Sequence, residues 1–265
     1  MTTDLSGSYH AAGTLERLLD GLAAAGADVD ALTPDVLGPV DEFHVLGVGA
    51  TRALGRAVHA DAGMSILDVG CGIGGPARRL AFELGPRVHG VDLTPEFVAA
   101  AVELTRRCRL DDRVTFSIGD ATALPPGDHD AAVMFHVNMN IAAKVQLFAS
   151  VRGAIGSGRF GIWEICRGAG PEPAFPMPWA VDRALSHLVT PAELADAAVD
   201  AGFAVERWDD KSEAGVAFFE RIRRDGPARG PNLGLLIPDF GPRAANLAAA
   251  LADGGVVLVQ GVLVA

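Results

Sequence analysis

The sequence predicts an α/β protein built on a doubly wound, mostly parallel sheet, and three observations carry this prediction. Short apolar runs alternate with helix-compatible stretches along the chain from residue 65 onward, the order typical of βαβ units. The run at 65–69 breaks on a glycine cluster at 70–75 and restarts as a helix, as at the opening of a nucleotide site. The chain is 49% hydrophobic, so it can bury a large core, and disorder is excluded.

The segment before the first strand is expected to be helical. Apolar positions at helical spacing predict a helix over 14–26, Thr33-Pro34 begins a short second helix, and a third is expected from about Ala50 to His59. Such a segment is either a structural cap or a lid over a bound cofactor. We therefore divide the chain into a helical lid, 1–60, and an α/β core, 61–265.

The core is expected to alternate strands and helices, and the last strand to add antiparallel after a sharp Gly-Gly break. Thr190 and Glu193 form a capping box, and the Pro-rich segment 169–179 is expected to be a loop within a substrate-loop insertion around 168–189. The expected strands are 65–69, 87–91, 114–118, 131–136, 159–165, 203–208 and 256–264, and the expected helices are 75–84, 94–108, 141–152, one beginning at 190, 212–224 and 242–252.

Charge and cysteine content exclude several functions. A net charge of -11 and a pI near 5.0 argue against nucleic acid, which needs a basic face. The densest basic cluster, 221–225, is more typical of a solvated helix face. Cys71, Cys108 and Cys166 lie far apart with no C-x-x-C spacing, which excludes a disulfide framework and a cysteine zinc site.

Targeting signals are not recognisable. Residues 1–10 lack a basic region and an apolar region of the secretory type, and no run reaches the about 18 apolar residues that span a membrane. We therefore expect a soluble, cytoplasmic protein with a small-molecule substrate and neither nucleic acid nor membrane as partner. The oligomeric state stays open, with a homodimer as one option.

The glycine cluster fits more than one nucleotide site, and an acid beside it distinguishes them. Gly70, Gly72 and Gly75 satisfy G-x-G-x-x-G, and Asp92 follows where a ribose-binding acid is expected. Asp68, two residues before the first glycine, would repel a pyrophosphate on the helix N-terminus. It would suit a ligand with an ammonium group and no phosphate, such as S-adenosylmethionine.

Two further acids agree with that ligand. Asp92 ends the second strand, where it can accept both ribose hydroxyls, and Leu93 beside it is assigned to the same site. Asp120 follows the third strand, where it can accept from an adenine amino group, while the backbone N–H of Ala121 can reach the ring. Carboxyl ends of parallel strands meet at one edge, so these residues are expected to surround one ligand.

This pattern resembles that of the class I S-adenosylmethionine-dependent methyltransferases, and within them a bacterial small-molecule branch. The resemblance implies a seven-stranded, Rossmann-like sheet, a helical lid, cofactor contacts through the acids and through Gly70, Gly72 and Gly74, and S-adenosylhomocysteine as product. The matching stretches are LDVGCGIGG (67–75), VDLT (91–94), GDAT (119–122) and GRFGIWE (158–164), with DEFHVLGVGATRAL (41–54) and HVNMNIAAK (136–144) for the branch.

The chain departs from two other methyltransferase types. After the fourth strand it has no Asn-Pro-Pro-Tyr-like signature of the enzymes that methylate amino groups of nucleic acid or protein. It also has no credible set of acids for a Mg²⁺-dependent catechol type. A metal-free reaction on a small metabolite is favoured.

Polar residues at the ends of the fourth and fifth strands are the first catalytic candidates. His136 can serve as a base or contact the sulfur side of the cofactor, or it is structural. Glu164 is either a pocket acid or a strand-end residue paired with an arginine such as Arg167. Asn138 and Asn140 can orient a substrate, although Asn140 can equally cap the following helix.

The lid supplies further candidates. His44 can reach the substrate or be structural, and Thr51 with Arg52 can hold the methionine carboxylate. The family resemblance suggests that Tyr9, the single tyrosine, closes over the cofactor. In the Pro-rich loop the apolar side chains wall the pocket or pack in the core, and Asp130 is interpreted as structural. The apolar loop residues are Phe175, Met177 and Trp179.

Three enzyme classes therefore compete. The leading hypothesis is metal-independent methyl transfer to an O, N or C atom of a small metabolite in secondary metabolism. A methyltransferase-like cyclase or isomerase that binds the cofactor without transferring methyl is the second. An NAD-dependent oxidoreductase is the third, and Asp68 argues against it. A non-catalytic binding module fits least well.

Overall fold

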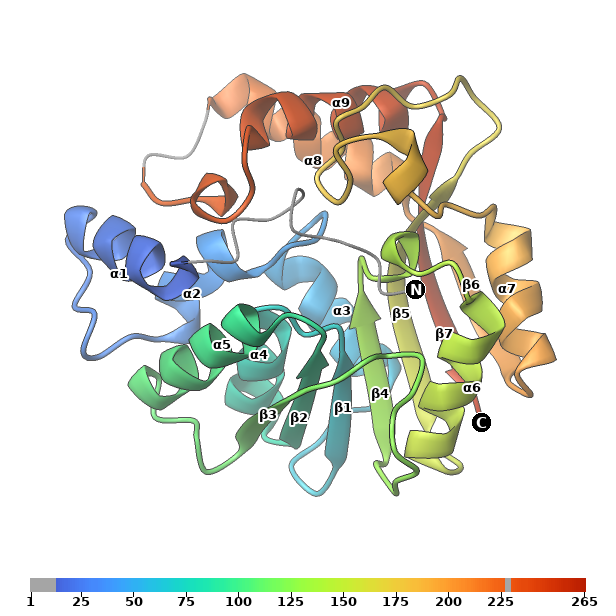
Figure 1. Cartoon of the computed structure of the whole chain (residues 1–265), viewed down its shortest axis with the longest axis horizontal. Coiled ribbons are helices and arrows are strands. Elements are labelled where there is room, and N and C mark those ends of the chain that lie inside the picture. The colour runs from blue at the N-terminus through green and yellow to red at the C-terminus, as the bar shows by residue number, and fades with distance from the viewer. Residues whose placement is uncertain (1–12, 227–229) are drawn as a thin grey trace.

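A seven-stranded sheet runs through the centre of the molecule, with helices on both faces (Figure 1). The computed structural model describes residues 13–226 and 230–265. The strand order within these residues is β3-β2-β1-β4-β5-β7-β6. The strands are β1 (Ser65–Val69), β2 (Arg87–Asp92), β3 (Val114–Ile118), β4 (Ala131–Phe135), β5 (Arg159–Arg167), β6 (Ala204–Asp210) and β7 (Val256–Val264).

The first five strands are parallel, and β7 runs antiparallel to both of its neighbours, β5 and β6. The order reverses at β1, with β2 on one side and β4 on the other, so the switch point lies where β1 and β4 end. The predicted doubly wound α/β class and the antiparallel final strand are confirmed.

The helices alternate with these strands largely as the sequence predicts. Thr190 and Glu193 make the predicted capping box at the start of α7. The helices are α1 (Thr14–Ala24), α2 (Pro34–Asp41), α3 (Val48–Ala57), α4 (Gly75–Leu84), α5 (Pro95–Arg107), α6 (Lys144–Ile155), α7 (Pro191–Asp200), α8 (Ser212–Asp225) and α9 (Phe240–Ala252), with 3₁₀ turns η1 (Asn138–Asn140), η2 (Arg183–Leu185) and η3 (Leu233–Leu235).

Two boundaries beside the site differ from the prediction. Strand β4 ends at Phe135, and His136 follows it with a φ of 54°, a left-handed conformation that no strand residue adopts. Helix α6 begins at Lys144 rather than at Ile141, because Ile141 ends the 3₁₀ turn η1 in an extended conformation (φ -118°, ψ 119°). Its N-cap is Ala143, so the prediction that Asn140 caps this helix is wrong.

Helix α3 packs directly on the sheet rather than over the strand ends. Its Leu54, together with Val58, lies in one core cluster with Ile66 of β1 and Leu80 of α4. Helices α1 and α2 instead share a separate cluster with α5 and the segment around Leu236.

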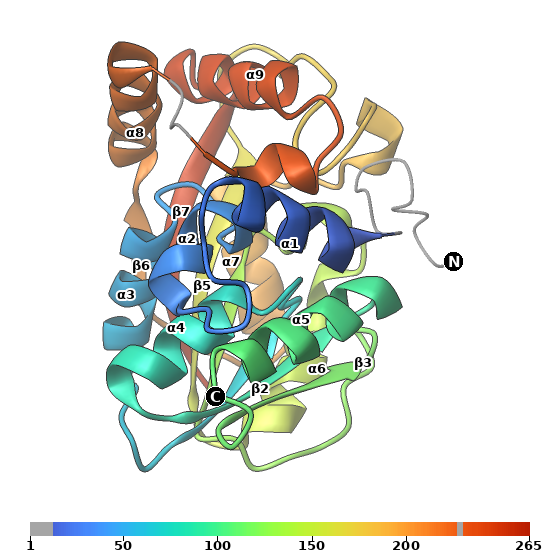
Figure 2. The same ribbon diagram turned by 90° about the vertical axis from the view of Figure 1, so that its left-hand side faces the viewer.

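A second set of segments covers the carboxyl ends of the parallel strands. Helices α8 and α9 lie between β6 and β7 in the chain, and Figures 1 and 2 show them above those strand ends, on the side where α1 also lies. The loop between β5 and α7 joins them, because the backbone N–H of His187 donates to the carbonyl of Met139 in η1 (2.8 Å). Helices α1, α8 and α9 and the loop between β5 and α7 therefore lie on the side of the sheet where the parallel strands end.

Candidate functional site

The glycine loop folds back tightly on β2 at the switch point. The backbone N–H groups of Gly70 and Cys71 both donate to the carbonyl of Val91 (2.8 and 3.1 Å). Gly70 has a φ of 70°, and a Cβ there would clash with Val137. Gly74 has a φ of 82°, with Phe116 2.5 Å from where its Cβ would lie. Glycine is therefore required at both positions.

Asp92 connects the glycine loop to the end of β2. Its Oδ2 accepts from the backbone N–H of Gly72 (2.8 Å) and its Oδ1 from that of Thr94 (2.9 Å). Burial raises the pKa of this carboxyl. Both oxygens keep acceptor capacity, so the carboxylate is fixed in a position where it can accept from two neighbouring hydroxyls. Leu93 beside it is 40% exposed.

Asp68 has an unsatisfied buried oxygen. The side chain is 1% exposed, and its Oδ2 has no hydrogen-bond partner among the described residues. Burial, and secondarily the charge of Asp92, raise the pKa of Asp68 to about 7. A buried carboxylate oxygen needs a donor or a cation. The residues present therefore fit a ligand that brings a positive group to the base of the glycine loop.

Asp120 and Ala121 lie at the far end of the same edge, after β3. The Oδ1 of Asp120 accepts from the backbone N–H and the hydroxyl of Thr122 (both 2.8 Å). Asp120 itself is exposed and Ala121 is half-buried. The acid is thus oriented by a local turn and accessible to a ligand.

The lid is locked onto the glycine loop by a buried ion pair. Arg78 of α4 is fully buried and donates to Asp41 of the lid (2.9 Å), to the hydroxyl of Thr105 (3.1 Å) and to a carbonyl of α5. The backbone of Asp41 lies so close to Gly75 that a Cβ on that glycine would clash. The ring of Phe43 lies 3.5 Å from the Cβ position of Gly72. Residues 41–43 therefore cover the loop directly.

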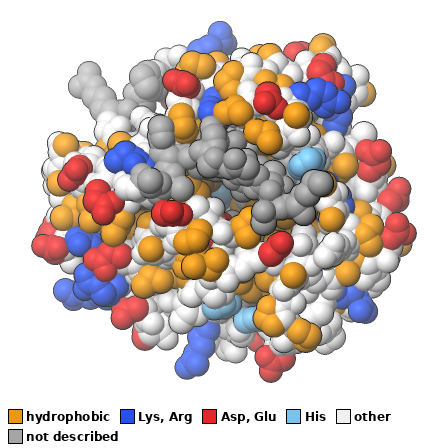
Figure 3. Space-filling view, viewed as in Figure 1, with side chains coloured by type: hydrophobic (Ala, Val, Ile, Leu, Met, Phe, Trp, Pro, Cys, Tyr) orange, Lys and Arg blue, Asp and Glu red, His pale blue; other side chains and the backbone are white. Residues whose placement is uncertain are grey.

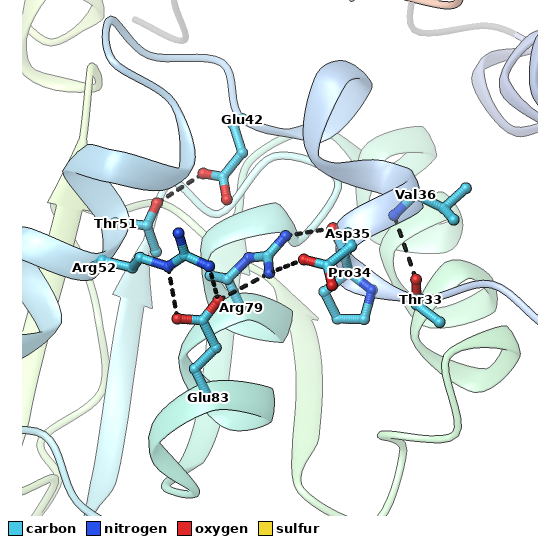
Figure 4. A network of polar contacts seen from close by, with 9 residues as sticks. All are labelled: Thr33, Pro34, Asp35, Val36, Glu42, Thr51, Arg52, Arg79 and Glu83. Carbon is cyan, nitrogen blue, oxygen red and sulfur yellow. Dashed lines mark hydrogen bonds and ion pairs between the residues drawn. The ribbon is translucent and has the colours of Figure 1, made fainter.

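Thr51 makes its hydrogen bond inside the lid, and Arg52 makes its hydrogen bonds at the surface. The hydroxyl of Thr51 donates to Oε2 of Glu42 (2.7 Å), and Arg52 donates to both oxygens of Glu83 on α4 (2.8 and 2.7 Å), as Figure 4 shows. Arg79 in the same view bridges Asp35 and Glu83. Thr51 therefore has no hydroxyl proton left for a methionine carboxylate, whereas the Nη1 of Arg52 is bonded to none of the residues in this view.

His44 and His136 meet at the end of β4. The ring of His44 stacks on Phe135 (centroids 4.6 Å apart) and lies edge-on to His136 (6.0 Å). The Nε2 of His44 lies 3.1 Å from the carbonyl of Gly47 and 3.3 Å from the hydroxyl oxygen of Thr51. Because the Thr51 proton goes to Glu42, we assign the ring proton to Nε2, which leaves Nδ1 as the acceptor.

Both imidazoles are neutral at neutral pH. Burial lowers the pKa of His44 to about 3, and burial together with the neighbouring His44 lowers that of His136. The backbone N–H of His136 donates to Trp163 (2.9 Å), while its buried Nε2 has no partner in the described part of the chain. In the tautomer that carries its proton on Nδ1, the Nε2 of His136 can accept a proton, and burial disfavours the resulting charge.

Glu164 holds the turn after β4 rather than facing an arginine. The carboxylate is fully buried and accepts from the backbone N–H groups of Val137 and Asn138 and from the Asn138 side chain (2.8 to 3.1 Å). Burial raises the pKa of Glu164 to about 7. Arg167 instead donates to nearby carbonyls and pairs with Glu172 (3.7 Å). The predicted alternative of a Glu164–Arg167 pair is wrong.

The remaining sequence candidates divide between core and periphery. Met177 and Trp179 are buried in the core, and the indole N–H of Trp179 donates to Ser186 (3.0 Å). Of the two predicted alternatives, pocket wall or core packing, this placement agrees with core packing. Asp130 accepts from the backbone N–H of Ser65 (2.8 Å), which confirms its structural interpretation. Tyr9 lies outside the described residues.

Sequence reasoning missed the buried charges that organise the site. Lys144 is 7% exposed, its ammonium donates to the carbonyls of Asn138 and Ile141, and burial lowers its pKa to about 8. Asp41, Glu42 and Arg78 are equally buried. The one available signal was the placement of these charges within otherwise apolar, helix-compatible stretches. No signal in the sequence indicates which residues pair with these charges, because the partners are distant in sequence.

The described residues contain neither a metal-binding cluster nor a membrane-spanning helix. They contain no group of three or more His, Cys, Asp or Glu that could hold a metal ion. In the same ranges no helix is both long and apolar enough to cross a membrane. On the face seen in Figure 3, Lys and Arg side chains lie scattered among Asp and Glu instead of gathering into one basic surface.

The sheet order, the glycine loop at the switch point and the acids at the strand ends define a Rossmann-like fold of the methyltransferase type. Residues 66–158 match the family described as "Methyltransferase domain". This match covers part of the chain, and it agrees with the expected resemblance to the class I, S-adenosylmethionine-dependent methyltransferases.

Curated relatives match over parts of their length. The chain is 36% identical to "Methyltransferase GfsG" of Streptomyces halstedii over 89 residues, which are 34% of this chain and 32% of that protein. It is 48% identical to "Phosphoethanolamine N-methyltransferase 2" of Caenorhabditis elegans over 59 residues, 22% and 13% of the two chains. The chain therefore spans a third or less of the length of these relatives.

Solved structures match over much more of the chain and establish the fold. Geranyl diphosphate C-methyltransferase from Streptomyces coelicolor A3(2), solved with S-adenosyl-L-homocysteine, superposes with a TM-score of 0.66 at 18% identity, over 83% of this chain and 78% of that one. The [4+2]-cyclase SpnF superposes with a TM-score of 0.69 at 22% identity, over 100% and 97%.

Proposed function

We propose that the protein is an enzyme that transfers the methyl group of S-adenosylmethionine to an O, N or C atom of a small metabolite, without a metal and in secondary metabolism. The observation that carries the proposal is the unpartnered, buried Oδ2 of Asp68 beside the glycine loop. Such an oxygen suits the ammonium group of this cofactor and disfavours the pyrophosphate of a dinucleotide. The match to a methyltransferase family model supports it.

The other acids would bind the remaining parts of the cofactor. Asp92, already oriented by two backbone N–H groups, would accept from the ribose hydroxyls. Asp120 and the backbone of Ala121 would bind the adenine, beside the exposed Leu93. When bound, the cofactor supplies an electrophilic methyl group on its sulfonium.

His136 and His44 are the candidates for the base that would take a proton from the acceptor atom of the substrate. His136 has an unpartnered Nε2 next to the strand end, and His44 has an unprotonated Nδ1 because its Nε2 donates to Gly47. We assign His136 as the first candidate for the base and His44 as the second. Glu164 would act through the turn that it holds, and not as the proton acceptor.

Binding and product formation test the proposal together. Isothermal titration with S-adenosylmethionine and with NADH should show binding of the first only. Mass spectrometry of small molecules retained by the purified protein should identify candidate acceptors. Turnover with such an acceptor should form S-adenosylhomocysteine together with the methylated product. Binding of NADH alone would overturn the proposal.

A cyclisation without methyl transfer is the second candidate. It is favoured by the likeness to the cyclase SpnF, which covers this whole chain. A cyclase would consume its substrate without forming S-adenosylhomocysteine. The ratio of S-adenosylhomocysteine formed to substrate consumed therefore separates the two reactions.

A further inference from the structure

Buried negative charge is in excess around the glycine loop. Asp41, Glu42 and Asp68 are all at most 5% exposed, and Asp92 adjoins them at the end of β2. Arg78 is the buried cation that hydrogen-bonds a member of this group, and it donates to Asp41. Glu42 and Asp68 are therefore left without a hydrogen-bonded cation in the described residues, which is costly for two buried carboxylates.

Glu42 is positioned over the loop by its two neighbours in the lid. Asp41 is held against Gly75 and Phe43 against Gly72, so the residue between them is fixed relative to the glycine loop. Asp68 is close enough for its charge to act on Glu42. Glu42 and Asp68 thus both adjoin the glycine loop. Glu42 stands between the two lid residues that cover the loop, and Asp68 lies on the strand before it, where its Oδ2 has no partner in the described residues.

The groups around Glu42 leave it one free oxygen. The Oε2 accepts from Thr51 of α3 (2.7 Å) and lies 3.5 Å from Nε2 of His44, whereas no hydrogen bond to Oε1 is made by the described residues. The charge of Arg79 on α4 also acts on Glu42, but this guanidinium is bonded to Asp35 and Glu83.

We propose that Glu42 joins Asp68 in binding the ammonium group of the cofactor's methionine moiety, so that the lid itself contributes a charged ligand to the cofactor site. This inference rests on the proposed function. The hydroxyl of Thr51 then acts as a positioning group, because it donates to the second oxygen of Glu42.

Proton release is the consequence that can be measured. Burial, followed by the charge of Asp41, raises the pKa of Glu42 to about 8, and burial raises that of Asp68 to about 7. Without a ligand, Glu42 is mostly protonated at pH 7. An ammonium group favours the ionised carboxylates, so the protons pass to the buffer on binding and affinity rises with pH from 6.5 to 8.

The experiment is isothermal titration at pH 7 in phosphate and in Tris, whose different ionisation enthalpies give the number of protons released. The probes are S-adenosylmethionine, S-adenosylhomocysteine and 5′-methylthioadenosine, which lacks the amino-acid moiety. Protons should be released with the first two probes and not with the third. The Glu42→Gln variant should release fewer and bind the first two about tenfold more weakly or worse, the loss of a charge-assisted hydrogen bond.

The controls separate the inference from the proposed function. Glu206→Gln removes an acid of β6 that pairs with Arg159 at the surface, and it should release as many protons as the unaltered protein. Equal proton release by Glu42→Gln, proton uptake, or equal release with 5′-methylthioadenosine would overturn the inference while S-adenosylmethionine binding stands. Failure of all three probes to bind would overturn the proposed function too. The probe comparison needs no variant, so misfolding of Glu42→Gln leaves the test intact.

Discussion

Glu164 within β5 and Asn138 in the turn after β4 are joined twice, through the backbone N–H (3.1 Å) and the side-chain amide (2.8 Å) of Asn138. The buried carboxylate thereby fixes the turn that follows His136. An acid that looked like a catalytic group in the sequence holds the site in shape.

Replacing Glu164 should therefore cost stability. Glu164→Gln leaves one acceptor oxygen for three N–H donors and turns an NH₂ group toward them, so we expect a loss of about 1–3 kcal/mol in the free energy of unfolding. Urea unfolding measures it. Glu172→Gln at the exposed end of the loop should change it by less than about 0.5 kcal/mol. Equal unfolding midpoints for the two variants would contradict this role.

The buried Arg78–Asp41 pair should matter far more than the exposed Arg52–Glu83 pair. Arg78→Met leaves a buried carboxylate without its cation, at a cost of about 3–5 kcal/mol, whereas Arg52→Met should cost at most about 1 kcal/mol. Denaturant melts of the two variants give the comparison. Adding Asp41→Asn to Arg78→Met should recover part of the loss, and no recovery would show that the packing of Arg78 matters more than its charge.

Stability of the ligand-free protein should fall as the pH rises from 6.5 to 8. In the folded state the pKa is raised to about 7 for Asp68 and Glu164 and to about 8 for Glu42, so the folded chain holds protons that the unfolded chain has lost. The lowered pKa values of His44 and His136 act in the opposite sense, mainly below pH 6.5. The lowered pKa of Lys144, about 8, also acts in the opposite sense and offsets part of the fall near pH 8.

Thermal melts across this range measure the slope. Asp68→Asn should flatten it, since each pH unit of difference in pKa corresponds to about 1.4 kcal/mol, while Asp112→Asn at the surface should leave it as it is. A free energy of unfolding that is constant or rises from pH 6.5 to 8 would refute the raised pKa values of these buried carboxyl groups.

His136→Asn should separate chemistry from folding. Asparagine tolerates the left-handed backbone at this position, so the fold should persist. The turnover number should fall by about 10² to 10⁴ if His136 is the base, with the dissociation constant of S-adenosylmethionine changed less than about twofold. His59→Asn is the matched control, because exposed His59 at the end of α3 has a similar φ of 60°. Unchanged turnover would exclude His136 as the base.

What could be predicted from the sequence was encoded locally. The apolar run before Gly70, the glycines themselves and the Thr190–Glu193 capping box each specify their structure within a few residues. Asp68 and Asp92 were found because the end of a strand is visible in the sequence.

The partners of the buried charges could not be predicted in that way. Arg78 meets Asp41 across 37 positions and Asn138 meets Glu164 across 26, and no periodicity records such a pairing. The same holds for the turn at Asn138, whose 3₁₀ form depends on Glu164 and on the ammonium of Lys144.

The position of β7 between β5 and β6 has a consequence for folding during synthesis. Among the described residues, strand β6 pairs only with β7, and β7 is made later in the chain, after α8 and α9. Until then β6 has no partner and presents unpaired backbone groups, which invite aggregation. Its acids Glu206, Asp209 and Asp210 give the waiting strand a charge that discourages pairing with another nascent chain.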